Sequence, residues 1–96
     1  MSEGRITHAE TDGKGRYVYR EDGHEAELTY ARLGEDKVIA NHTGVPDALS
    51  GTGVGLKLVE RLVADARAQG FRIVPQCPFV EAMRKRNPDW ADAFTT

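Results

Sequence analysis

A glycine-dense turn between a strand-like run and a long amphipathic helix constrains this chain more than any other feature. The turn covers residues 45–55 and reads VPDALSGTGVG, and the helix is expected over Val54–Gln69. Glycine reaches positive φ without a steric penalty and lets the backbone approach a ligand closely. The helix start offers unpaired N–H groups and the positive end of a dipole, which favour a phosphate or pyrophosphate. The turn therefore predicts an anion site, although a flexible turn that only starts a helix has the same composition.

The residues around the turn exclude the familiar nucleotide-binding loops. A P-loop ends in Gly-Lys-Ser or Gly-Lys-Thr, whereas Leu56-Lys57-Leu58 follows Gly55. A Rossmann turn closes the first strand of a parallel unit. Here Asp22-Gly23 separates two strand-like runs, and Asp-Gly is a strong signal for an antiparallel hairpin. We therefore expect an antiparallel meander before the turn, with Gly34 at the next reversal.

Hydrophobic periodicity indicates the strands. Ala26, Leu28 and Tyr30 alternate with polar residues, which is the period of a strand with one covered face. A further strand is expected over residues 38–45. Another follows the long helix at residues 71–74, where a crossover of this length permits parallel pairing.

The ends of the chain complete the expected fold. Residues 1–15 form a polar N-terminal segment with a short edge strand beginning at Ile6, and residues 78–86 form a second helix. Trp90 and Phe94 are expected to fold back onto the core. The fold class is therefore α+β, an α/β sandwich-like arrangement of a mixed, mostly antiparallel sheet and two main helices.

Four motifs occur in order along the chain. They are HTGVP at 42–46, SGTGVG at 50–55, VPQCPFV at 74–80 and RNPDW at 86–90. The series resembles the small, single-domain YjdJ-type branch of the GNAT acetyltransferase superfamily, over about residues 16–94. The resemblance implies a minimal GNAT fold, one domain over residues 1–96, and acetyl-CoA as cofactor.

The resemblance also implies where the cofactor binds, with its pyrophosphate on the amides of the glycine turn. The expected cofactor contacts are Thr43, Val45, Ser50, Gly51, Thr52, Gly53, Val54 and Gly55. The run Arg84-Lys85-Arg86 is either a solvated helix face or a site for the adenosine 3′-phosphate, and we name Arg84 and Lys57 as the cations that contact CoA.

Two positions depart from the superfamily pattern. Ser50 stands where arginine or glutamine is usual, so one polar contact to the cofactor is lost. Met83 stands near the position where many small relatives carry an aromatic residue and larger enzymes carry a tyrosine as general acid. Methionine cannot donate a proton, so that role passes elsewhere or is absent.

Cys77 is the first candidate catalytic residue. It directly precedes Pro78, and proline suits the first position of a helix. Cys77 is therefore expected at the N-cap, where the helix dipole stabilises a thiolate. If the flanking strands diverge to admit CoA, as the resemblance implies, the thiol can protonate the departing CoA thiolate or accept the acetyl group. The other interpretation is a small buried hydrophobe.

His42 is the second candidate catalytic residue. Strand alternation places it on the face of Val38 and Ala40, opposite Asn41 and Thr43. A histidine titrates near neutral pH and can deprotonate an incoming ammonium, directly or through water. The alternative, which we favour, is a histidine that only hydrogen-bonds the loop backbone.

Composition narrows the class of protein. The 96 residues carry a net charge of −2, so no broad basic field indicates nucleic acid. The apolar runs are far too short for a membrane span, and the N-terminus lacks a signal-peptide core. A single cysteine excludes an intramolecular disulfide and suits a reducing cytoplasm. We expect a cytoplasmic domain with no metal and no nucleic-acid or membrane partner.

The predicted function is an acetyl-CoA-dependent N-acetyltransferase that transfers its acetyl group directly to a small-molecule or peptide amine. A strand amide would polarise the thioester oxygen. The alternative is a non-catalytic acyl-CoA-binding or interaction module, which Met83 and the shortness of the chain favour. No motif names the acceptor or the oligomeric state.

Overall fold

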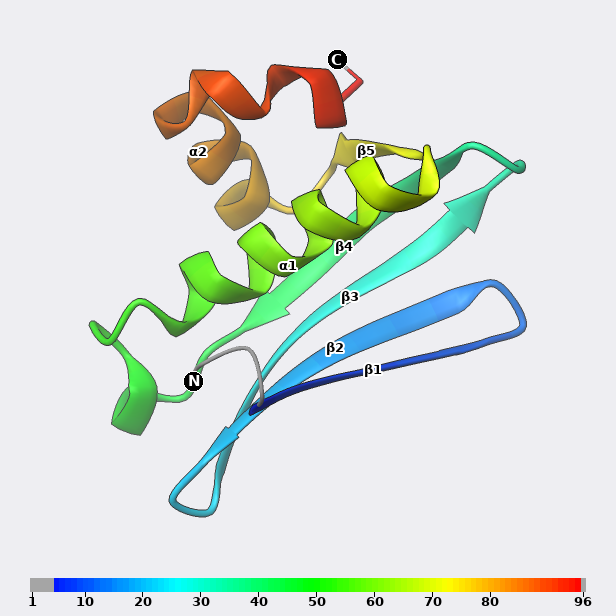
Figure 1. Cartoon of the computed structure of the whole chain (residues 1–96). Helices are drawn as coiled ribbons and strands as arrows, with labels where there is room; N and C mark the ends of the chain where they lie inside the picture. The colour runs from blue at the N-terminus through cyan, green and yellow to red at the C-terminus, as the bar shows by residue number, and fades with distance from the viewer. Residues whose placement is uncertain (1–4, 96) are drawn as a thin grey trace.

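Five strands form one sheet, and the helices pack against one of its faces (Figure 1). The computed structural model describes residues 5–95. The strands are β1 (Ile6–Thr11), β2 (Lys14–Glu21), β3 (His24–Leu33), β4 (Lys37–Gly44) and β5 (Arg72–Pro75). The helices are α1 (Val54–Gln69) and α2 (Pro78–Arg86), with short 3-10 helices at Asp47–Leu49 and Pro88–Ala93. β1 to β4 pair antiparallel in chain order and β5 pairs parallel to β4, so the predicted α+β class and mixed sheet are confirmed.

Two Asp-Gly turns close the first two hairpins. Asp22-Gly23 joins β2 to β3 as predicted, and Asp12-Gly13 joins β1 to β2. In both turns the two residues have positive φ, between 50° and 78°, as a type I′ turn requires. The predicted edge strand therefore exists and extends to Thr11. The first four residues of the polar N-terminal segment lie outside the described residues.

The core lies between α1 and the sheet. α1 has the predicted bounds and ends at Gly70, whose φ of 79° is left-handed. Its apolar stripe is buried against Ala26, Leu28 and Tyr30 of β3, which are at most 2% exposed. The buried residues of that stripe are Leu58, Val59, Leu62, Val63 and Ala66. No helix within residues 5–95 combines the length and apolar character needed to cross a bilayer.

The C-terminal segment closes the core beside β5. Phe94 forms an isolated parallel bridge with Ile73, and the Thr95 amide donates a 2.9 Å hydrogen bond to the Ile73 carbonyl. Trp90 and Phe94 are both buried. The predicted return of these two aromatic residues to the core is therefore confirmed.

A β-bulge in β4 changes the face on which His42 lies. Thr29 pairs with His42 whereas the next residue of β3 pairs with Ala40, so Asn41 is an extra residue in β4. The Thr29 hydroxyl donates a 2.6 Å hydrogen bond to Asn41 Oδ1, and both residues lie on the face away from the helices. The predicted alternation, with His42 on the face of Ala40, is wrong because one inserted residue reverses the faces beyond it. Thr43 returns instead to the helix-covered face.

β4 and β5 separate after four paired residues. Their last pair is Ala40 with Pro75, and the Cys77 amide then donates a 2.8 Å hydrogen bond to the Ala40 carbonyl. From there the chain turns into α2, while β4 continues to Gly44. Within residues 5–95 no strand pairs with this last part of β4 on its β5 side. The sheet therefore opens at the N-terminus of α2.

Candidate functional site

The glycine turn forms one wall of a pocket of about 310 Å³. Phe79, Met83 and Arg86 of α2 also line it. Six of the predicted cofactor contacts line it: Val45, Ser50, Gly51, Gly53, Val54 and Gly55. The pocket therefore brings together most of the residues that the resemblance predicts to contact CoA.

The start of α1 leaves backbone donors free at this pocket. Gly53 is the N-cap residue with φ 82°, and the first helical hydrogen bond runs from the Lys57 amide to the Gly53 carbonyl at 3.0 Å. No side chain caps the helix, and its first turn contains no acidic residue. The amides of Val54, Gly55 and Leu56 therefore have no partner within the helix. A helix start of this kind can bind an anion.

Thr52 stabilises the turn rather than lining the pocket. Its hydroxyl donates a 2.5 Å hydrogen bond to the Leu49 carbonyl, and its amide donates to the same oxygen at 3.3 Å. Leu49 is buried in the core. These bonds hold the glycine turn to the body of the protein.

Gly55 allows α1 and α2 to approach each other closely beside the pocket. A Cβ atom at this position would lie 2.6 Å from Cζ of Phe79. The aromatic ring therefore packs directly on the first turn of α1. Phe79 is a pocket residue that the sequence pattern did not identify.

Arg86 is the cation at the pocket. Arg84 instead forms an ion pair with Glu81, with N–O distances of 2.6 and 3.0 Å. Lys57 extends toward the sheet, where its Nζ lies 5.7 Å from the centre of the Tyr19 ring. Neither of these predicted cations lines the pocket. Among residues 5–95 Arg86 has no ion-pair partner, so its charge is available to a ligand.

Cys77 occupies the predicted N-cap position of α2 and is 6% exposed. Its Sγ lies 3.5 Å from Thr43 Oγ1, across the gap between β4 and α2. Burial alone raises the pKa of the thiol, but hydrogen bonding by the Thr43 hydroxyl and by the amides of Val80 and Phe79 outweighs it. The net pKa is therefore lowered. Although no side chain makes a regular cap bond here, the amide groups at the helix start still favour a thiolate.

His42 lies on the outer face of the sheet and its side chain is 58% exposed. Its Nε2 is 3.5 Å from Oε2 of Glu27. Within residues 5–95 the hydrogen bond to the loop backbone that we favoured from the sequence does not form. The imidazole is accessible and next to a carboxylate.

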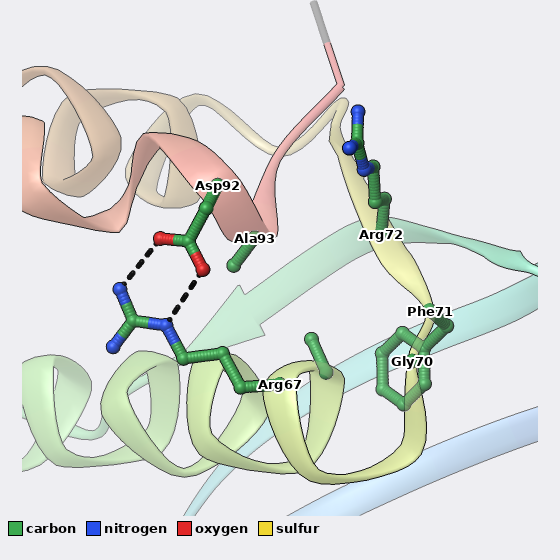
Figure 2. A pocket seen from close by; sticks show the side chains of 7 residues that line it. Arg67, Gly70, Phe71, Arg72, Asp92 and Ala93 are labelled. Carbon is green, nitrogen blue, oxygen red and sulfur yellow. Dashed lines mark hydrogen bonds and ion pairs between the residues drawn. The ribbon is translucent and has the colours of Figure 1, made fainter.

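A separate hollow of about 280 Å³ lies at the other end of α1 (Figure 2). Arg67 spans it with two hydrogen bonds to the Asp92 carboxylate, at 3.0 and 2.7 Å, and a third to the Asp89 carbonyl at 2.8 Å. The Arg67 guanidinium lowers the pKa of Asp92. These bonds attach the C-terminal 3-10 helix to α1, and none of the predicted site residues lines the hollow.

Comparison with known proteins agrees with the fold described above. Residues 16–93 match the family model described as GCN5-related N-acetyl-transferase. Among solved structures, the chain is similar to a GCN5-like candidate N-acetyltransferase from Staphylococcus aureus, determined in solution by NMR. The two are 28% identical with a TM-score of 0.70, over 95% of this chain and 89% of that one. No curated protein matches the chain.

Proposed function

Because the chain belongs to the GCN5-related N-acetyltransferase family, we propose that it binds acetyl-CoA at the glycine turn and transfers the acetyl group to an amine. The proposal is supported by two features that line one pocket, an uncapped helix start and an arginine with no ion-pair partner among residues 5–95. The start of α1 and Arg86 of α2 both line this pocket. This arrangement suits the phosphate groups of CoA.

We assign two parts of the cofactor, the pyrophosphate and the thioester, to residues of this chain. We assign the pyrophosphate to the amides of Val54, Gly55 and Leu56, because no acidic side chain lies in this first turn. We assign the thioester to the opening between β4 and β5, where Thr43 and Cys77 lie in contact. When bound, acetyl-CoA supplies an acetyl group activated as a thioester.

The backbone of β4 is proposed to stabilise the negative charge that develops on the thioester oxygen. Beyond Ala40 this strand has no β5 partner within the described residues. A free N–H of this segment can donate to the thioester oxygen as negative charge develops on it. A preorganised amide of this kind costs no reorganisation during the reaction.

Cys77 is the proposed proton donor to the leaving sulfur. Its lowered pKa means that the thiol, when protonated, releases the proton from Sγ more readily than an ordinary cysteine does. Covalent acceptance of the acetyl group by the same sulfur is the second route open to this residue. The two routes differ in whether an acetylated Cys77 accumulates.

The decisive experiment compares binding with turnover. Acetyl-CoA binding is measured by calorimetry, and release of free CoA thiol is measured with a panel of primary amines. We expect binding together with amine-dependent release well above the hydrolysis rate without amine. Binding without amine-dependent release would make the chain an acyl-CoA-binding module, and absence of binding would remove the cofactor assignment.

A further inference from the structure

The face of the sheet that the helices leave uncovered divides into two halves. In the half nearer the end of β4, Arg16 and Arg20 form ion pairs with Glu25 and Glu27 at N–O distances between 2.5 and 3.5 Å. Val18 pairs with Glu27 in the register and is 4% exposed, although it lies outside the core beneath α1. In this half the charged side chains therefore pair with one another and cover the apolar residue among them.

The other half carries an apolar patch that the helices do not cover. Its residues alternate along their strands with Tyr30, Val38 and Ile73, which are buried on the opposite face, so their side chains point outward. Three of them form one row across β3, β4 and β5, and the fourth lies two residues further along β3. We call them the outer patch: Ala31, Leu33, Ile39 and Val74. Leu33 is 50% exposed, more than any other large apolar side chain among residues 5–95.

The charges around the outer patch are not satisfied within the chain. They lie on the strands that flank it and in the turns that close the two neighbouring hairpins. All are exposed, and none forms an ion pair within the described part of the chain. These residues are Asp12, Lys14, Glu35, Asp36, Lys37 and Arg72. The rim therefore carries three cations and three anions.

We infer that the outer patch is the interface of a two-fold dimer of this chain, in which two sheets pack face to face. Exposed apolar surface with a polar rim is typical of a protein interface. A rim that holds both signs in equal number complements a second copy of itself, whereas an anionic membrane or a nucleic acid requires a surplus of cations. The inference does not depend on the proposed function, because the interface lies on the face away from α1.

The strand order determines which charges meet in this dimer. β3 lies between β2 and β4. A two-fold axis along β3, in the plane between the sheets, therefore places β2 of each copy opposite β4 of the other. Leu33 pairs with Lys37, and the β2–β3 register continued by two residues brings Asp12 level with Leu33 on its other side. The leucines of the two copies then meet at the axis, and Asp12 of each copy faces Lys37 of the other.

This dimer leaves both copies of the glycine turn free. The turn follows the end of β4, whereas the outer patch flanks the start of that strand (Figure 1). The helices that line the cofactor pocket also lie on the opposite face of the sheet. We therefore expect acetyl-CoA to bind the monomer and the dimer with the same affinity.

The first test measures association of the whole chain by sedimentation equilibrium at micromolar to millimolar concentrations. We expect a monomer–dimer equilibrium, and we expect Leu33→Lys to raise the dimer Kd by more than about tenfold, because it removes an apolar contact at the axis. Leu56→Lys is the matched control, since Leu56 is 38% exposed but lies on α1. A monomer at every concentration, or a dimer that Leu33→Lys leaves intact, would overturn the inference.

The second test examines the predicted contact between Asp12 and Lys37. Lys37→Glu places two acidic side chains together at each end of the interface and should raise the dimer Kd by about tenfold. The same change in an Asp12→Asn background should have an effect of at most about twofold, because the repelling charge is absent. Asparagine suits position 12, whose φ is 54°. Lys85→Glu, on the exposed side of α2, controls for the change in net charge.

Two outcomes of these experiments would contradict the two-fold arrangement. One is an equal effect of Lys37→Glu in both backgrounds, which would mean that Asp12 does not face it. The other is a protein that stays monomeric and sediments with phosphatidylserine vesicles, which would make the outer patch a membrane-binding surface. Loss of the Lys37→Glu effect in the Asp12→Asn background, with both variants folded, would support the dimer.

Discussion

The thiol of Cys77 lies 3.5 Å from the hydroxyl oxygen of Thr43, and this contact joins the start of α2 to the end of β4. Thr43 reaches the thiol because the extra residue in β4, Asn41, returns it to the helix-covered face. The same bulge directs His42 to the opposite face. One inserted residue therefore places His42 on the side of the sheet opposite to Cys77.

We expect Cys77 to react with iodoacetamide below about pH 8, because its pKa is lowered from the ordinary value of a free thiol. Saturating acetyl-CoA should slow the reaction by filling the opening between β4 and β5. Thr43→Val removes one of the groups that stabilise the thiolate and should move the pH dependence of alkylation upward. Mass spectrometry of the alkylated protein gives the rates. A thiol that reacts only after denaturation would be core packing, and its catalytic assignment would be lost.

Cys77→Ser should lower transferase activity by roughly ten- to a thousandfold, the range for losing a positioned acid or nucleophile. The hydroxyl ionises far less readily than the thiol, whereas CoA affinity should barely change. Turnover and calorimetry on the same preparation measure the two effects. A brief incubation of the wild-type protein with acetyl-CoA distinguishes the general-acid route from the covalent route. An acetylated Cys77 in the mass spectrum supports covalent transfer. Full activity in the serine variant would exclude both routes.

Arg86→Gln should weaken acetyl-CoA binding by about tenfold, because a charge-assisted contact to phosphate is lost. Arg84→Gln is the matched control. It removes the same charge from the same helix, but Arg84 is paired with Glu81 and does not line the pocket. Calorimetry at two salt concentrations should show a smaller salt dependence for the Arg86 variant only. Equal effects of both substitutions would indicate a diffuse field rather than a site at Arg86.

The three tyrosines should remain protonated until the protein unfolds in alkali. Burial, followed by the hydrogen bond to Asp65, raises the pKa of Tyr17, and burial, followed by the hydrogen bond to Glu10, raises that of Tyr30. The hydrogen bond to Glu21 is the main cause of the raised pKa of Tyr19.

The raised pKa values of the tyrosines determine how the stability of the protein changes with pH. Above about pH 10 the unfolded chain loses phenolic protons that the folded chain keeps, so stability falls as the pH rises. Urea midpoints should therefore decline above that pH, and less steeply in Tyr17→Phe. Ultraviolet titration should show tyrosinate forming together with unfolding. Complete ionisation of the folded protein near pH 10 would contradict these pKa directions.

Local signals in the sequence were enough to predict much of the fold. The spacing of the apolar residues and Gly70 predicted both ends of α1, and Asp22-Gly23 predicted a hairpin. The Asp12-Gly13 turn carries the same signal, but it lies in a polar segment without apolar alternation. The length of β1 was therefore missed.

The bulge and the cation at the pocket depend on tertiary contacts. Asn41 is accommodated by a hydrogen bond from Thr29 on the neighbouring strand, which no periodicity along β4 reveals. Arg84 and Arg86 lie about 200° apart around α2, since each residue turns a helix by about 100°. Which arginine faces the pocket depends on how α2 packs against α1, and the sequence does not encode this locally.

Substitutions at Gly53 test whether the pyrophosphate of CoA binds at the glycine turn. Its φ of 82° favours glycine, but a Cβ atom there would meet nothing within 4 Å. Asparagine and aspartate tolerate this conformation better than other side chains. Gly70 has φ 79° and equally open surroundings at the far end of α1, so Gly70→Asn measures the backbone cost alone.

Calorimetric titration of acetyl-CoA into Gly53→Asn, Gly53→Asp and Gly70→Asn is the deciding measurement. We expect Gly70→Asn to bind as the wild type does, and Gly53→Asn to bind more weakly because its side chain stands where the pyrophosphate meets the backbone. Gly53→Asp should lose more than about tenfold in affinity, or 1.4 kcal/mol, because it adds a repelling charge. Wild-type affinity in a folded Gly53→Asp variant would contradict the account and move the pyrophosphate away from this turn.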